Sequence, residues 1–272
     1  PVRQRLLYNL MDMSININTS NSNLIDYLVE DVDLTKKILQ KSKISSISQN
    51  RISITNLKQS IIRLGYENVH NEIQNHLASC FAKNYFSSDN EHTKTLIKRS
   101  VRLAFLGREL NSLLGLNMEN LVFFAGLNFH IGEIALSMHD PRSMNEIFSM
   151  TQRGVDPKTA EIAVLGFDLA ELSGKIVSKW HLPDSVIDLV KNSADLTLVH
   201  PSNYRSALLM RFVLYLTTAF SFKNLSPRAI WEKAYEYMGK LDVLHINSEI
   251  WIEQIKFLYI RLLETEHIIF QR

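Results

Sequence analysis

The sequence predicts an all-α protein, and three observations support this fold class. Apolar residues recur at helical spacing along nearly the whole chain, and no stretch of useful length alternates as a strand does. Gly and Pro are scarce, at 9 and 6 of 272 residues. Because 46% of the residues are hydrophobic, the chain can bury a sizeable core in one large domain or two smaller ones.

The first third of the chain contains several predicted short helices. Two of these span residues 2–13 and 23–30. The stretch DVDLTKKILQKS then places apolar residues on one face, with Asp33 as its expected N-cap. Residues 43–54 are polar and rich in Ser, which is typical of a loop.

Two further helices precede the clearest break in the chain. The first begins near Thr55 or Asn56 and ends at Gly65, and the second runs from about Glu67 to Tyr85. The polar stretch SSDNEH, residues 87–92, then separates this region from the rest and is the predicted domain boundary.

The centre of the chain is predicted to hold long helices. One spans about 93–114 and is closed by Gly115. Asn117 is the expected N-cap of the next, 118–138, which Asp140-Pro141 should end.

The pair Asp156-Pro157 is a strong start signal, because an N-cap is followed by Pro at the first helical position. We expect that helix to reach Trp180, and another to begin within HLPDSVIDLV. Three more are expected near residues 203–222, 226–239 and 248–268.

Composition narrows the function classes. A net charge of +2 predicts neither nucleic acid nor a membrane surface as a partner. The single cysteine, Cys80, allows no internal disulfide and no CxxC zinc site, which favours a reducing cytoplasm. Residues 206–222 are shorter than the roughly 20 residues that a membrane span needs, and Arg211 interrupts them, so a buried helix is predicted there.

Four stretches together resemble the bacterial HDOD family, the HD-related output domain. In order they are NLIDYLVEDVDLTKKILQKS, LKQSIIRLGYENVHNEI, FAGLNFHIGEIAL and LGFDLAELSGKIVSKWHLPDSVIDLV. The most specific elements are IRLG (Ile62 to Gly65), AGL…IG (Ala125 to Gly132) and W-x-LP (Trp180 to Pro183). The resemblance covers roughly residues 5–195.

The resemblance implies an N-terminal helical subdomain packed on a helical core like that of the HD phosphohydrolases. We therefore expect the subdomain over residues 1–88, the HD-like core over 89–200 and a helical extension packed on the core over 201–272. It also implies a bacterial signalling module whose relatives, the HD phosphohydrolases, hydrolyse phosphate esters with divalent metals.

The positions that match the family's metal ligands carry unsuitable side chains here. Arg99 replaces the first His, and a guanidinium stays protonated. Phe129 and His130 replace the His-Asp pair, Leu169 replaces the downstream His, and Asn192 stands in the last pair. Since His130 alone cannot hold a catalytic metal, we expect no metal, no cofactor and no enzymatic activity.

Helical stripes support the same expectation. Between Ile162 and Trp180, apolar residues recur every three or four positions, and Leu169 is one of them. This spacing predicts one continuous helix with Leu169 on its apolar face. Filling a former ligand cavity with Phe129 and Leu169 would add about 1.5–3 kcal/mol of burial per side chain.

The sequence also contains a literal His-Asp pair, His139-Asp140, ten residues after Phe129-His130. It would lie about 15 Å further along a helix and is interpreted as a helix end.

Cys80 is predicted to be an unreactive residue of the core. The aromatic-rich C-terminal part is interpreted as packing, with a homodimer or partner surface as the alternative. The remaining histidines are expected to be exposed or to make a single hydrogen bond: His76, His92, His181, His200, His245 and His267.

The function predicted first is a non-catalytic cytoplasmic signalling module that binds a protein partner. One alternative is a residual phosphohydrolase, for which His130, His139, Asp140 and Asp168 would have to converge. The other is a sensor of a nucleotide or cyclic dinucleotide, with Arg99 for an anion and His130 and Asn192 as polar partners.

Overall fold

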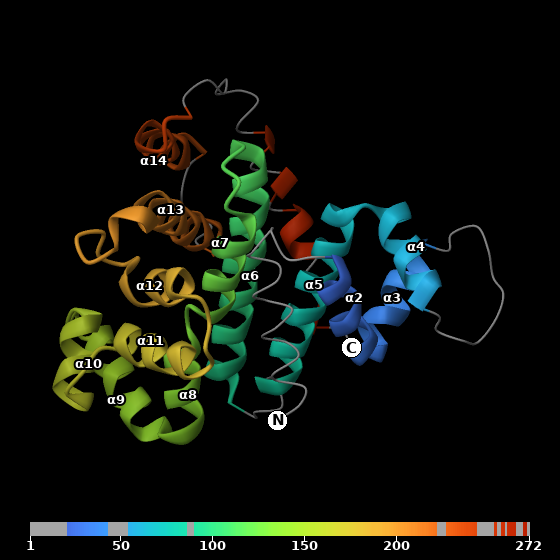
Figure 1. The fold of residues 1–272 in the computed structure, drawn as a ribbon. Coiled ribbons are helices and arrows are strands. Elements are labelled where there is room, and N and C mark those ends of the chain that lie inside the picture. Colours follow the sequence, from blue (N-terminus) through green and yellow to red (C-terminus); the bar gives the residue numbers. More distant parts are fainter. Residues whose placement is uncertain are drawn as a thin grey trace. The chain divides into compact units, whose positions relative to one another are not determined.

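The computed structural model describes residues 21–42, 54–85, 90–221 and 227–243, with short pieces at 253–254, 257–258, 260–264 and 269–270. Every regular element in these residues is helical, which confirms the predicted all-α class (Figure 1). Three predicted segments lie wholly or largely outside the described residues: the helix over 2–13, the loop over 43–54 and much of the helix over 248–268.

The chain divides into two compact units, Pro1–Phe81 and Ala82–Arg272. In the first unit, α3 (Val32–Ser42) packs against both α2 (Asn21–Glu30) and α4 (Ile54–Leu64). Helix α5 (Tyr66–Tyr85) follows. The apolar faces of these helices supply a fully buried core that includes Leu28, Leu34, Ile38, Leu57, Val69 and Ile73.

Two predictions in the first unit need correction. Asp31, and not Asp33, caps α3, because its Oδ1 accepts a hydrogen bond from the Leu34 N–H at 2.9 Å. His76 is neither exposed nor singly bonded: its Nε2 lies 2.9 Å from Asp31 Oδ2 and 3.5 Å from Cys80 Sγ, and all three side chains are buried. The predicted burial of Cys80 is confirmed, as is the end of α4 at Gly65, whose φ of 78° is left-handed.

The second unit is organised around α6 (Glu91–Leu114), which packs against α7, α8 and α13 (Figure 1). Helix α7 also contacts α12, and α11 lies between α8 and α12. After α6 the elements are α7 (Glu119–Asn128), α8 (Ile131–His139), α9 (Pro141–Gln152), α10 (Pro157–Leu165), α11 (Leu169–Lys179), α12 (Asp184–Asn192), a 3-10 turn (Pro201–Asn203), α13 (Tyr204–Ser221) and α14 (Pro227–Lys240).

Helix α6 is delimited largely as its sequence predicts. Asn90 caps it by accepting hydrogen bonds from the N–H groups of His92 and Thr93, and Gly115 ends it in the left-handed region with φ 63°. The prediction that Asn117 caps the next helix is wrong, because Asn117 has φ 54° and α7 begins after Met118. Instead, the buried Asn111 side chain accepts the Met118 N–H at 2.9 Å.

The helix predicted over 118–138 is two helices. It is interrupted at Phe129 and His130, and His130 leaves helical geometry with φ −94° and ψ 16°. Phe129 and His130, which were predicted to match a metal-binding His-Asp pair, therefore lie in a turn between α7 and α8, and not within a helix.

The helix predicted from Pro157 to Trp180 is also two helices. Gly166 ends α10 with φ 79°, and Asp168 starts α11 by accepting the Glu171 N–H. The prediction of one continuous apolar face is therefore wrong. Ile162 is 48% exposed, whereas Leu169 begins α11 and is buried.

Asp140-Pro141 ends α8 as predicted, and it also starts α9, which the sequence reading did not include. Asp140 Oδ1 accepts the Ser143 N–H at 3.2 Å and Oδ2 accepts the Ser143 hydroxyl at 2.6 Å. The interpretation of His139-Asp140 as a helix boundary is confirmed.

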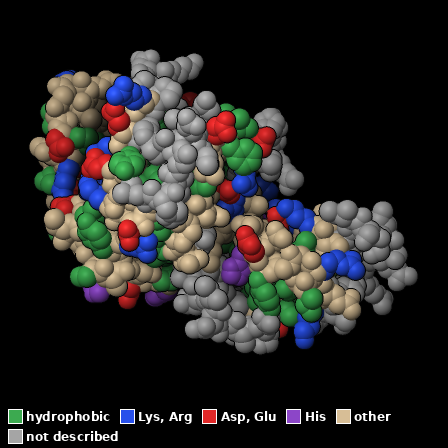
Figure 2. All heavy atoms as spheres, turned by 90° about the horizontal axis from the view of Figure 1, so that it is seen from above, with side chains coloured by type: hydrophobic (Ala, Val, Ile, Leu, Met, Phe, Trp, Pro, Cys, Tyr) green, Lys and Arg blue, Asp and Glu red, His purple; other side chains and the backbone are tan. Residues whose placement is uncertain are grey.

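One stretch among the described residues, Asn120–His139, is long and apolar enough to cross a membrane, and 61% of its apolar window is buried. Core helices have the same properties. Residues 206–222 form most of α13, whose Leu208, Leu209, Phe212 and Val213 are buried as expected. On the face drawn in Figure 2, acidic and basic side chains of the described residues are interspersed.

Candidate functional site

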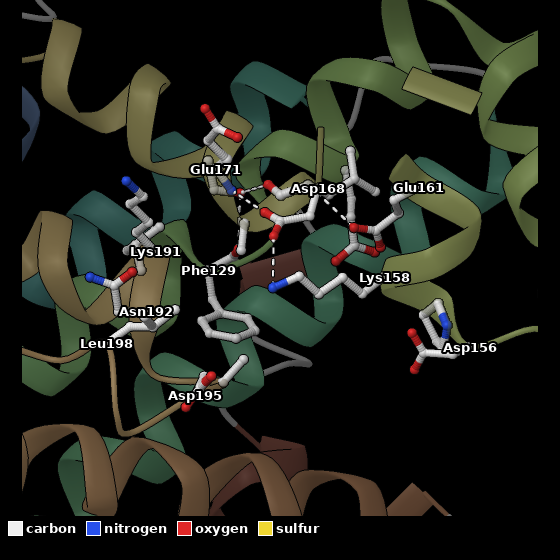
Figure 3. A pocket seen from close by; sticks show the side chains of 17 residues that line it. Phe129, Asp156, Lys158, Glu161, Asp168, Glu171, Lys191, Asn192, Asp195 and Leu198 are labelled. Carbon is white, nitrogen blue, oxygen red and sulfur yellow. Dashed lines mark hydrogen bonds and ion pairs between the residues drawn. The ribbon is translucent and has the colours of Figure 1, made fainter. Parts of the chain in front are cut away.

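Three of the five positions predicted to match metal ligands line one pocket of about 410 Å³ in the second unit (Figure 3). Phe129 comes from the turn between α7 and α8, Leu169 from the start of α11 and Asn192 from the end of α12. Residues that are 63 positions apart in the chain therefore meet at one place. Arg99 and His130 are not among the lining residues.

His130 does not line the pocket, but it pairs with Glu133, which does. Its Nδ1 is 2.6 Å from Glu133 Oε1, and the two side chains are 13% and 27% exposed. Burial alone would raise the pKa of Glu133, but the charges of His130, Arg99 and His92 and the hydrogen bond from His130 outweigh burial and lower it. Arg99 and His130 therefore both interact electrostatically with the Glu133 carboxylate.

The candidate ligand pocket predicted from Arg99, His130 and Asn192 is only partly assembled. Asn192 lines the cavity, and its Nδ2 donates to Asp188 Oδ1 at 2.8 Å. Arg99 is an exposed residue of α6. Binding of an anion by these three residues remains a prediction.

The donor atoms at the three pocket positions do not suit a hydrolytic metal. Phe129 and Leu169 have no donor atom in their side chains, and Asn192 offers only the neutral oxygen of its side-chain amide. Within the described ranges, no group of three or more His, Cys, Asp or Glu side chains is placed to hold a metal ion. His130, His139, Asp140 and Asp168 form no such group.

Carboxylates dominate the polar part of the wall. Asp156 and Asp168 are the N-caps of α10 and α11, and Lys158 Nζ lies 3.2 Å from Asp168 Oδ2. Glu161 Oε2 accepts the Leu169 N–H at 2.7 Å, which joins α10 to the start of α11. Burial raises the pKa of Glu161, and the nearby charges of Glu133, Asp168 and Asp156 raise it further, against the opposing Leu169 hydrogen bond.

A comparison with protein families shows to which family the chain belongs. The HDOD domain matches residues 1–196. The chain belongs to the HDOD family. Among curated proteins, none matches the chain.

Solved structures share the HDOD fold at low sequence identity. An HDOD domain protein of unknown function from Geobacter sulfurreducens has a TM-score of 0.72 and 14% identity, covering 97% of this chain and 91% of that one. A provisionally named phosphohydrolase from Shewanella amazonensis SB2B has a TM-score of 0.68 and 14% identity, covering 96% and 91%. A provisionally named signal transduction protein from Marinobacter aquaeolei VT8 has a TM-score of 0.64 and 15% identity, covering 97% and 58%.

The glycines of the HDOD element AGL…IG allow two close helix contacts. A Cβ on Gly126 would lie 2.7 Å from the Ala104 backbone N in α6. A Cβ on Gly132 would lie 2.6 Å from the Leu169 carbonyl oxygen, and the Gly132 N–H donates to Ser173 Oγ at 3.0 Å. The Gly126 contact brings α7 close to α6, and the Gly132 contacts hold α8 against α11, next to the turn that contains Phe129.

The other HDOD elements form helix junctions. Gly65 ends α4, and Arg63 donates to the Ser42 carbonyl at 3.3 Å. Trp180 ends α11, and the buried Leu182 precedes Pro183, the N-cap of α12.

Sequence reasoning missed most of the charged residues of the pocket, including Glu133, Glu161 and Asp195. For Glu133 a signal existed, because His130 and Glu133 are three residues apart in a region expected to be helical. Glu161 gave no such signal, since its contact with Leu169 depends on the bend at Gly166.

Proposed function

We propose that this chain is a non-catalytic regulatory module of bacterial signal transduction that acts by binding a protein partner. The supporting observation is the chemistry of the pocket at the former ligand positions. Phe129 and Leu169 give that pocket apolar side chains where a phosphohydrolase would need metal ligands.

The energetics of these positions also support a structural role. Leu169 is only 4% exposed, and burial of such a side chain contributes about 1.5–3 kcal/mol. Polar ligands left there without a metal would instead cost desolvation energy. Apolar residues at these positions therefore stabilise the folded protein when no metal is bound.

The names of the fold relatives suggest two different activities. One is called a signal transduction protein and another a phosphohydrolase, and both are about 15% identical to this chain or less. The side chains at the matching positions are the better guide, and here they favour signalling over hydrolysis.

The residual phosphohydrolase alternative has weaker support. It needs Asp140 and Asp168 at one metal, yet each caps the helix that follows it, and His130 is paired with Glu133. A metal would have to compete with each of these interactions.

A metal and activity assay separates the two functions. Purified protein is analysed for bound metals and assayed with manganese on p-nitrophenyl phosphate and bis-p-nitrophenyl phosphate. We expect no stoichiometric metal and no hydrolysis above the level of an Asp168→Asn, His130→Ala double variant. Manganese-dependent hydrolysis that the double variant loses would overturn the proposal.

Partner binding is tested in the native cell by placing a photo-crosslinking amino acid at exposed apolar positions, one at a time. Suitable positions are Phe148, Ile162, Leu198, Tyr204 and Tyr235. We expect at least one of them to form a reproducible adduct with one identified protein, and no adduct from the exposed control position Lys179. A full set of positions without any specific adduct would contradict the proposal.

A further inference from the structure

The pocket at the former metal site carries an excess of negative charge. It lies between α10, α11 and α12 and includes the turn at Phe129 (Figure 3). Six carboxylates and two lysines contribute to its lining: Glu133, Asp156, Glu161, Asp168, Glu171 and Asp195, with Lys158 and Lys191.

Three of these carboxylates make no ion pair with a described residue: Asp156, Glu161 and Asp195. Asp156 accepts hydrogen bonds from the backbone and hydroxyl of Thr159, and Asp195 accepts the same pair from Thr197. The charges of Lys158 and Arg211 act on Asp195 without forming an ion pair with it. The remaining three carboxylates each make one ion pair, namely Lys158–Asp168, Lys175–Glu171 and His130–Glu133, and the charges of Arg99 and His92 also act on Glu133.

Glu161 is a carboxylate that a nearby cation would stabilise. It is partly buried, one of its oxygens is occupied by the Leu169 N–H, and three other carboxylates act on it. The same surroundings raise the pKa of Glu161. A positive charge placed beside it would relieve both the repulsion and the loss of hydration.

Apart from Ser173 and Asn192, the other residues that line the pocket are apolar. Phe129 points into the cavity in Figure 3, and Leu169 and Val190 form buried parts of the wall. Leu198 also lines the pocket, yet it is 58% exposed. A ligand that suits this surface has both a positive charge and an apolar portion.

We propose that this pocket binds an arginine or lysine side chain that projects, beside an apolar residue, from a segment of the partner protein. The inference rests on the proposed function and specifies the chemistry of the partner. The cationic group pairs with Glu161, the aliphatic stem packs on Phe129, and the neighbouring apolar residue covers Leu198.

Other ligand classes fit less well. A nucleotide or cyclic dinucleotide would bring phosphates to a surface where carboxylates outnumber lysines by six to two. A divalent metal lacks a group of three ligands within the described residues. A side chain on a protein also suits the exposure of Leu198, because a partner surface can cover it.

The test uses the whole chain and two probes of opposite charge, the peptide N-acetyl-Leu-Arg-Leu-amide and cyclic di-GMP. Binding is followed by NMR, with signals of Ala194 and Leu198 reporting on the pocket. We expect the peptide to bind, Glu161→Gln to weaken it roughly fivefold and Lys158→Gln to tighten it. Glu232→Gln makes the same charge change on the exposed surface of α14 and should leave binding unchanged.

Each other outcome overturns the inference. If cyclic di-GMP binds and Glu161→Gln strengthens it, the pocket is an anion site. If the peptide shifts no pocket signal, or binds equally well to the Glu161→Gln variant, the pocket is not its site. These failures leave the proposed function standing, because cross-linking at positions away from Leu198 tests partner binding independently.

Discussion

The buried pair of His76 and Asp31 makes the stability of the first unit depend on alkaline pH. The two side chains are 4% and 5% exposed, and their atoms lie 2.9 Å apart. Burial alone would lower the pKa of His76, but its hydrogen bonds to Asp31 and Cys80 and the charges of these two groups raise it from the ordinary 6.5 to about 9.

The sign and size of the effect follow from linkage. Because the folded protein holds the His76 proton more tightly than the unfolded chain, the added stability is complete below pH 6.5. It disappears as the pH rises through 9. A difference of this size corresponds to roughly 3 kcal/mol, at 1.36 kcal/mol for each pKa unit.

The assay compares the native protein with His76→Gln in urea titrations between about pH 6 and pH 10. Methyl NMR signals of Ile38 and Ile73 report on the buried core of this unit. All three tryptophans, Trp180, Trp231 and Trp251, lie beyond residue 81, so their fluorescence follows the other unit.

We expect the stability difference between the two proteins to shrink by about 3 kcal/mol across this range. Asp31→Asn serves as the matched control, because Oδ1 still caps α3 while the charge is lost, and it should remove the same alkaline dependence. A difference that stays constant from pH 6 to pH 10 would refute the reasoning.

Three further predictions concern the second unit. Gly132→Ala should destabilise the protein by about 1–3 kcal/mol in thermal unfolding, because the added Cβ meets the Leu169 carbonyl at 2.6 Å; Gly174→Ala, whose Cβ meets only the flexible Lys191 side chain, should cost much less. Glu133→Gln should destabilise at neutral pH, and because the pKa of Glu133 is lowered on folding, the difference should vanish as acid protonates the native carboxylate; an acid-independent difference in urea titrations would contradict this. Asp140→Ala should lower the melting temperature by removing the N-cap of α9 and leave the metal content of the purified protein unchanged, whereas loss of a bound metal would make His139-Asp140 a ligand pair.

Many helix ends could be predicted because they depend only on residues within about one turn. Gly65 and Gly115 end α4 and α6 because only a residue that tolerates positive φ stops a helix in this way. Asp156-Pro157 starts α10 because an N-cap carboxylate and a fixed φ at the first position act within one turn. These signals need no knowledge of distant residues.

The missed helix breaks depend on more distant packing. Phe129 and His130 have side chains that a helix tolerates, and the turn there directly precedes the close contact of Gly132 with α11. At Gly166 the signal was present, but an apparently continuous apolar stripe from Ile162 to Trp180 concealed it. The exposure of Ile162 shows that periodicity alone cannot tell whether a face has a neighbour.

By itself, the sequence determined the helical class, most helix ends, the HDOD family and the absence of donor atoms from the side chains of Phe129 and Leu169. These properties depend on residue type and on spacings within a few turns. Only the tertiary structure decided which residues meet: Phe129, Leu169 and Asn192 share a pocket, and carboxylates from several helices give it negative charge. The physical reason is that contacts between distant segments depend on how helices cross and turn, and one changed turn moves every side chain beyond it.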